Sequence, residues 1–251
     1  MGYQSMGMSD AEFTVWKRGT GCAEQGKYIQ HLGPHVAPYV SSVSEHGYEM
    51  ELLHPHQHDD TDLTWTLQKI CALLVEHVWP LPPVSPPDHT WDQQMAAWMH
   101  AHGASYLVPH LSACYATVTL AGYVRIHGDP TVANLMLRRN GQTTEAQPIL
   151  VDPLPPKGKV PSRIEVDVGK MLQSALGWEH AVRTDLVPAR GTRCAQTAFL
   201  GAFSQDVRRR GWLWCAIHLQ RAAPYCRARG RWKLATWAED TARHVEATEL
   251  R

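Results

Sequence analysis

The sequence lacks the marks of a membrane protein and of a secreted protein. None of its apolar runs approaches the roughly 18 residues that a membrane-spanning helix needs. The start of the chain, MGYQSMGMSD, has no basic patch followed by an apolar stretch, so we expect no secretory signal. The six cysteines lie far apart and form no C-x-x-C pair. This pattern predicts reduced thiols in a cytoplasmic protein.

The chain has no net charge, but its two signs are unevenly distributed. Residues 1–180 hold 11 Lys or Arg and 18 Asp or Glu, which gives −7, and residues 181–251 hold 13 and 6, which gives +7. The basic end would attract an anionic partner, including nucleic acid. The alternative is that these side chains only form the solvated faces of helices.

The hydrophobic pattern divides the chain into a short strand-rich part and a longer helical part. The first part has strand patterns at 12–18 and 47–53 and a helix at 23–32 that ends before Gly33-Pro34. Helical patterns follow at 63–78, 91–122, 163–176 and most of 192–249. A hairpin interrupts them, with strands at 134–137 and 149–151 and a turn at Asn140-Gly141.

The stretch RIHGDPTVAN, residues 125–134, is the most informative part of the sequence. Asp129 precedes Asn134 by five residues, on a loop that leads into a strand. Such a carboxylate can accept a hydrogen bond from a hydroxyl and aim the hydroxyl oxygen at a γ-phosphate. The amide oxygen can bind Mg²⁺ held by the phosphates. Asp and Asn are also common in ordinary turns, so the loop alone does not decide between the two interpretations.

A second acid favours the catalytic interpretation. Phosphoryl transfer needs a further ligand that bridges the metal and the nucleotide. Asp152 follows the second hairpin strand, ILV, and its spacing lets it converge with Asn134 on one metal ion. The sequence therefore predicts Asn134 and Asp152 as Mg²⁺ ligands and Asp129 as the catalytic base.

These residues resemble the core of the aminoglycoside phosphotransferase and choline kinase-like families, which share the protein-kinase fold. The resemblance rests on His127-Gly-Asp129 followed by Asn134, on the strand before Asp152, and on the segment that contains Asp167. It implies an α+β, protein-kinase-like fold of two lobes. Residues 1–54 would form a reduced N-terminal β-lobe and residues 55–251 a mainly helical C-terminal lobe.

The resemblance extends more weakly to a nucleotide site upstream. Lys17 resembles the lysine that contacts the α- and β-phosphates of ATP, and Glu24 resembles its ion-pair partner. The segment 49–53 resembles the hinge strand, whose backbone would hydrogen-bond adenine. Asp167 would hold the backbone of the catalytic loop. The remaining cofactor contacts that the resemblance implies are Glu49, Met50, Glu51 and, as the floor under adenine, Met136. An exposed strand lysine and an ordinary helix-start acid are the alternatives for Lys17 and Glu24.

The chain departs from the family pattern in its phosphate loop. Gly2 and Gly7 are the only glycines before Lys17, so the glycine-rich loop is poorly represented. Asp152 is followed by Pro153 rather than by Phe-Gly, which favours a stiff loop over a mobile activation segment.

The expected function is an ATP-dependent kinase that uses Mg²⁺ and transfers the γ-phosphoryl group to a hydroxyl of a small molecule. The acceptor would be anionic if the +7 excess lines its pocket. Two alternatives are open: a kinase that acts on a protein or nucleic acid through the basic helices, and a nucleotide-binding pseudokinase. The sequence does not indicate an oligomeric state.

Overall fold

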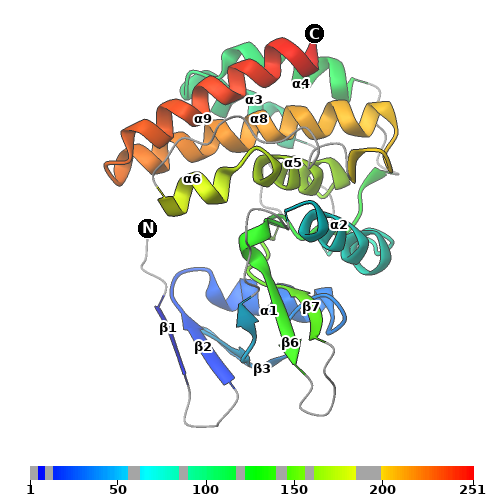
Figure 1. Ribbon diagram of the computed structural model, residues 1–251, viewed down its shortest axis with the longest axis vertical. Coiled ribbons are helices and arrows are strands. Elements are labelled where there is room, and N and C mark those ends of the chain that lie inside the picture. Colours follow the sequence, from blue (N-terminus) through cyan, green and yellow to red (C-terminus); the bar gives the residue numbers. More distant parts are fainter. Residues whose placement is uncertain are drawn as a thin grey trace.

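The computed structural model describes residues 5–8, 14–55, 63–84, 90–116, 122–139, 146–155, 161–184 and 199–251. Strands and one helix occupy one end of the molecule, and the other helices form layers at the opposite end (Figure 1). The boundary near residue 54 stays a prediction. No helix among the described residues is long and apolar enough to cross a membrane.

The N-terminal part is an antiparallel sheet with the strand order β1-β2-β4-β3. Its strands are β1 (Ser5–Met8), β2 (Thr14–Arg18), β3 (Val40–Ser44) and β4 (Gly47–Glu51). Helix α1 (Cys22–Leu32) connects β2 to β3 and buries Tyr28, Ile29 and Leu32. The alternation of buried and partly exposed residues along β2 fits a sheet with one face against the core. This arrangement turns Lys17, buried on β2, away from solvent.

A second, smaller sheet connects the two parts of the molecule. It pairs β5 (His54–Pro55) with β6 (Leu135–Arg139), and β6 with β7 (Ala146–Leu150). The pairing of Leu135 with Leu150 sets the register of the hairpin at its base. In Figure 1 the hairpin, in green, extends from the helical layers toward α1 and the first sheet. It therefore brings the segment after β7 next to β2.

The helical part packs around α8 (Gln205–Ala228), which has 24 residues. It contains α2 (Leu63–Leu73) with a π-helical turn at Leu74–Val78, α3 (Trp91–Ala101), a 3₁₀ turn at Ser105–Leu107, α4 (Val108–Tyr115), α5 (Ile164–Ala175), α6 (Trp178–Thr184), α8 (Gln205–Ala228), α9 (Trp232–Val245) and a π-helical turn at Glu246–Leu250. Ser204 caps α8 by accepting a hydrogen bond from the Val207 N–H.

Close contact between α5 and α8 depends on two small residues. A Cβ on Gly169 would lie 2.6 Å from the Trp214 Cβ, and a Cβ on Gly211 would lie 2.5 Å from a Val168 methyl group. Both distances are too short for real atoms, so glycine at each position lets the helix backbones approach. This packing fixes α5, which carries two residues of the candidate site described below.

The structure confirms the α+β, kinase-like arrangement of a reduced sheet part and a helical part, and it confirms most of the expected elements. It adds β1, β3, β5 and α6, which the hydrophobic pattern does not predict. β1 is only four residues long, in agreement with the expected reduced N-terminal β-lobe. The predicted turn at Asn140-Gly141 and the predicted helical residues 117–121 and 192–198 lie outside the described residues. The five cysteines among the described residues are buried, and none of them is in a disulfide.

Candidate active site

The backbone of the loop that carries Asp129 is held by the side chain of Asp167, in the first turn of α5. The Asp167 carboxylate accepts hydrogen bonds from the backbone N–H of His127 at 2.9 Å and of Gly128 at 2.7 Å. It also accepts one from the Trp79 indole N–H at 3.0 Å. Burial raises the pKa of Asp167 to about 6, although all three donors favour its ionised form. This geometry agrees with the structural role expected for Asp167.

The neighbouring histidine is a buried part of the same scaffold. Burial lowers the pKa of His127 to about 4, against the opposing influence of Asp129 and Asp152. Its Nδ1 accepts a hydrogen bond from the Asp129 backbone N–H at 3.4 Å. A neutral ring fits this role, because a charged imidazole would pay the full cost of desolvation.

The loop also requires glycine at position 128. Gly128 has a φ of +84°, and a Cβ there would lie 2.0 Å from the Leu154 backbone oxygen. The Leu154 N–H donates to the His127 carbonyl at 2.9 Å, so the segment after Asp152 lies directly against the loop. Only a residue without a side chain allows this approach.

Asp129 lies between a cation and an amide. Lys170 of α5 places its Nζ 3.0 Å from Asp129 Oδ1. Asn134 donates from its Nδ2 to the Asp129 carbonyl at 2.9 Å and to Asp129 Oδ2 at 3.2 Å. Because the side-chain nitrogen of Asn134 is used in this way, its side-chain oxygen, Oδ1, is left for another partner.

Asp152 and Lys17 meet across the junction of the two parts. Lys17 Nζ lies 2.5 Å from Asp152 Oδ1, although the residues are 135 positions apart. Asp152 has a φ of +53°, which is uncommon for a residue other than glycine and typical of functional turns. The Val151 N–H donates to the Asn134 carbonyl at 2.8 Å, which connects the two predicted metal ligands through the backbone.

Helix α1 contributes a further polar contact to this junction. Gln25 donates from its Nε2 to the Pro153 carbonyl at 3.0 Å, and it accepts from the Tyr48 hydroxyl at 3.4 Å. Glu24 lies in the first turn of the same helix. The Lys17 ammonium pairs with Asp152, and its pairing with Glu24 stays a prediction.

The residues expected around adenine fall into two groups. Glu49, Met50 and Glu51 lie within β4, which pairs with β2 on one side and β3 on the other. Met136 packs against a small apolar cluster of Leu53, Ile149 and Val151. This cluster lies where the chain leaves β4 and β7, next to Asp152. The roles of all four residues toward a nucleotide stay predictions.

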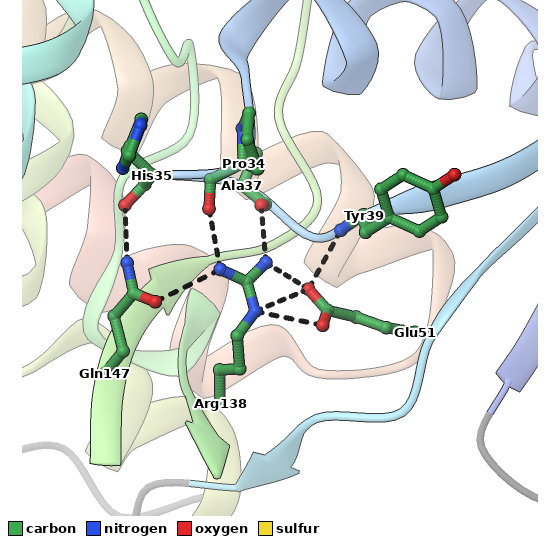
Figure 2. Close-up of polar contacts among 7 residues, drawn as sticks. All are labelled: Pro34, His35, Ala37, Tyr39, Glu51, Arg138 and Gln147. Carbon is green, nitrogen blue, oxygen red and sulfur yellow. Dashed lines mark hydrogen bonds and ion pairs between the residues drawn. The ribbon is translucent and has the colours of Figure 1, made fainter. Parts of the chain in front are cut away.

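Glu51 has a structural partner that sequence reasoning does not predict. Arg138 of β6 donates from its Nε to both Glu51 carboxylate oxygens at 2.9 Å. Figure 2 shows its guanidinium also reaching the carbonyls of Pro34 and Ala37 and the side chain of Gln147. The hairpin is thereby bonded to the N-terminal part.

A cavity of about 450 Å³ opens beside Asp129. Its walls are the loop residues 129 and 131–134, Lys170 of α5, and Trp178, Glu179, Val182 and Arg183 of α6. The volume is within the usual range for a small-molecule site. Lys170 lies in the segment that carries the family resemblance, but α6 has no signal in the sequence that marks it as a wall of the site.

The donor set fits Mg²⁺. A magnesium ion takes oxygen ligands, usually one or two carboxylates together with substrate phosphates and waters. The Asp152 carboxylate and the Asn134 amide oxygen are such groups. Among the described residues no three His, Cys, Asp or Glu side chains are grouped to hold a metal by themselves.

Solved structures of small-molecule kinases have the same fold. A choline kinase from Cryptosporidium parvum Iowa II has a TM-score of 0.55 and 9% identity, over 97% of this chain and 88% of that chain. The GDP and kanamycin complex of APH(2")-IIia has a TM-score of 0.54 and 12% identity, over 98% and 94%. A Plasmodium vivax ethanolamine kinase has a TM-score of 0.50 and 8% identity, over 96% and 81%.

These likenesses confirm a kinase-like fold of the type found in aminoglycoside phosphotransferases and choline kinases. No family model matches the sequence, and no curated protein does.

Proposed function

We propose that this protein is an ATP-dependent phosphotransferase that moves the γ-phosphoryl group to a hydroxyl of a small molecule. One observation carries the proposal: Asp129 and Asn134 are bonded to each other on the wall of a cavity, and the backbone bond from Val151 to Asn134 connects this loop to the Asp152–Lys17 pair. A scaffold without catalysis has no need of this set, whereas phosphoryl transfer uses each member.

The residues have distinct roles in the proposed reaction. Asp129 orients the acceptor hydroxyl and takes its proton late, since the transition state is loose. Lys17 binds the phosphates of the nucleotide. Asn134 and Asp152 would hold Mg²⁺, which would neutralise the charge that develops on the phosphate oxygens. Positioning and electrostatic stabilisation then supply most of the rate enhancement.

Kinase action on a nucleic acid has less support. Several arginines of the basic end make contacts within the chain: Arg210 pairs with Glu165, Arg227 pairs with Glu239, and Arg231 donates to the Val182 carbonyl. Side chains used in this way are not available as a docking face. Docking through the remaining basic residues stays a prediction.

The test is ATP consumption with a panel of acceptors, with Asp129→Asn as the blank. We expect Asp129→Asn to abolish turnover and to keep the thermal shift that Mg·ATP produces. Asp152→Asn should instead weaken the Mg²⁺-dependent part of that shift. A wild-type protein that is stabilised by Mg·ATP but consumes none with any acceptor would be a pseudokinase. Normal turnover by both variants would overturn the assignment.

A further inference from the structure

The cavity beside Asp129 has one buried acid that the proposed mechanism does not use. Glu179 of α6 is 8% exposed and lines the cavity together with Asp129. Its Oε1 accepts a hydrogen bond from the Ser174 hydroxyl at 2.8 Å. Its Oε2 has no hydrogen-bond partner. A buried carboxylate oxygen without a partner costs free energy, so its presence needs an explanation.

Glu179 is joined to the catalytic loop. Ser174, which donates to Glu179, accepts a hydrogen bond from the Val132 N–H at 3.4 Å. Val132 lies between Asp129 and Asn134, in the 3₁₀ turn Val132–Asn134. The position of the Glu179 carboxyl is therefore fixed relative to the Asp129 loop, as a substrate-positioning group requires.

The charged residues that line the cavity are Asp129, Lys170, Glu179 and Arg183. Lys170 is paired with Asp129, and Arg183 is exposed at the end of α6. Burial is the main cause that raises the pKa of Glu179 to about 7, and the Ser174 hydroxyl only partly opposes it. A carboxyl that is partly protonated near neutral pH can either donate to a hydroxyl or accept from one. It is a poor sole partner for a full positive charge, and it repels an anion when ionised.

The cavity also has an apolar wall suited to a ring. Trp178 precedes Glu179 on α6, and its indole stacks on Trp237 with ring centroids 6.1 Å apart. This stacking holds the indole in place. Aromatic faces bind the C–H faces of rings through apolar contact, and adjacent polar groups then fix the orientation of the ring.

We propose that Glu179 selects the acceptor, and that the acceptor is a neutral, polyhydroxylated ring compound. One hydroxyl bonds to the Glu179 carboxyl, another is presented to Asp129, and the ring lies against Trp178. The inference rests on the proposed function for the role of Asp129. It replaces the anionic acceptor expected from the basic end of the chain.

The experiment measures binding and turnover separately. Saturation-transfer NMR would follow three sets of probes with the wild-type protein: glucose, ribose and myo-inositol as neutral compounds, glucosamine as a cation, and glucose 6-phosphate as an anion. ADP release would be followed with the same compounds. Glu179→Ala is the test variant, because alanine removes both the donor and the acceptor of the carboxyl. Glu45→Ala is the matched control, because it makes the same change on a side chain that is 84% exposed in the N-terminal part.

We expect the wild-type protein to prefer neutral compounds. Glu179→Ala should raise the acceptor Kd or KM by about 10-fold or more, the usual effect of losing a hydrogen bond to a carboxylate. The Mg·ATP thermal shift should be unchanged. Glu45→Ala should alter neither quantity. Arg183→Ala should weaken acceptor binding less than Glu179→Ala does.

Two outcomes would overturn the inference: preferential binding of the charged probes, or equal binding of neutral compounds by wild type and Glu179→Ala. Should Glu179→Ala not fold, Trp178→Leu provides the decision, because it must weaken ring binding several-fold without changing the Mg·ATP shift. The proposed function fails separately. A protein that binds neutral rings through Glu179 but consumes no ATP supports the inference and contradicts the kinase activity.

Discussion

Lys17 and Asp152 form an ion pair across the junction of the sheet part and the helical part, with Nζ and Oδ1 2.5 Å apart. The lysine side chain is 10% exposed and the aspartate side chain is 44% exposed. The two side chains of the pair therefore differ in their access to solvent. Lys17 depends on Asp152 for its counter-charge, whereas Asp152 can be solvated by water.

This inequality predicts the effects of removing each partner on stability. Asp152→Asn should lower the free energy of unfolding by about 1–3 kcal/mol, because a buried ammonium loses its partner. Lys17→Met should cost less, because water can solvate the remaining carboxylate. Urea unfolding of both single variants and of the double variant measures the coupling. Equal costs for the two single variants would contradict this account of the pair.

Gly128 and Gly230 provide a matched pair of substitutions. Both have positive φ, +84° and +73°, but a Cβ at Gly230 would meet nothing within 4 Å. Gly230→Ala should therefore cost only the backbone strain, about 1–2 kcal/mol. Gly128→Ala adds a clash with the Leu154 carbonyl, so it should cost more in urea unfolding. It should also reduce phosphotransfer, because Asp129 is the next residue. Similar losses of stability at the two positions would show that the close approach to Leu154 is unimportant.

The sequence indicates the candidate catalytic and metal-binding residues, but it does not indicate which residues line the cavity beside them. The residues Asp129, Asn134 and Asp152 are recognisable because their spacing along one loop and one hairpin is local. Glu179 has no such signal: α6 is only seven residues long, and its burial results from packing that no local pattern records. β3, with the sequence VSSVS, is too short and polar to be predicted as a strand.

Arg138 is a second residue whose role cannot be predicted from the local sequence. A pair of arginines before a hairpin turn is typical of a solvated tip, and nothing nearby in sequence indicates a partner. The partners are Glu51 and the 34–37 segment, about a hundred positions earlier in the chain. Contacts of this kind follow from the tertiary fold and cannot be predicted from one sequence.

The Arg138 contacts predict a specific local effect (Figure 2). Arg138→Gln removes the hydrogen bonds to the Pro34 and Ala37 carbonyls and to Glu51. Hydrogen exchange should become faster in residues 34–39 and at the β6–β7 hairpin, and should stay unchanged in α8 and α9. Lys27→Met, which removes an exposed cation from α1, serves as the control. Unaltered exchange in 34–39 would show that these contacts do not hold the hairpin to the N-terminal part.

Glu179 predicts a pH dependence of stability with a definite sign. Its pKa rises from 4.5 to about 7 in the folded protein, chiefly because it is buried. The folded state thus holds the proton more tightly than the unfolded state, and its contribution to stability falls as pH rises from about 5 to 8. The expected loss over this range is about 2–3 kcal/mol.

Glu179→Gln isolates this contribution, because glutamine has the same shape and does not titrate. Asp167 and His127 titrate in nearby ranges, but they are present in both proteins and cancel in the difference. The free energy of unfolding of the wild-type protein, minus that of Glu179→Gln, should therefore decline between pH 5 and pH 8, as measured by urea unfolding at each pH. Glu45→Gln should run parallel to wild type. If the stability of Glu179→Gln changes with pH in parallel to that of the wild-type protein, burial does not raise the pKa of Glu179, and its carboxyl is ionised throughout this range.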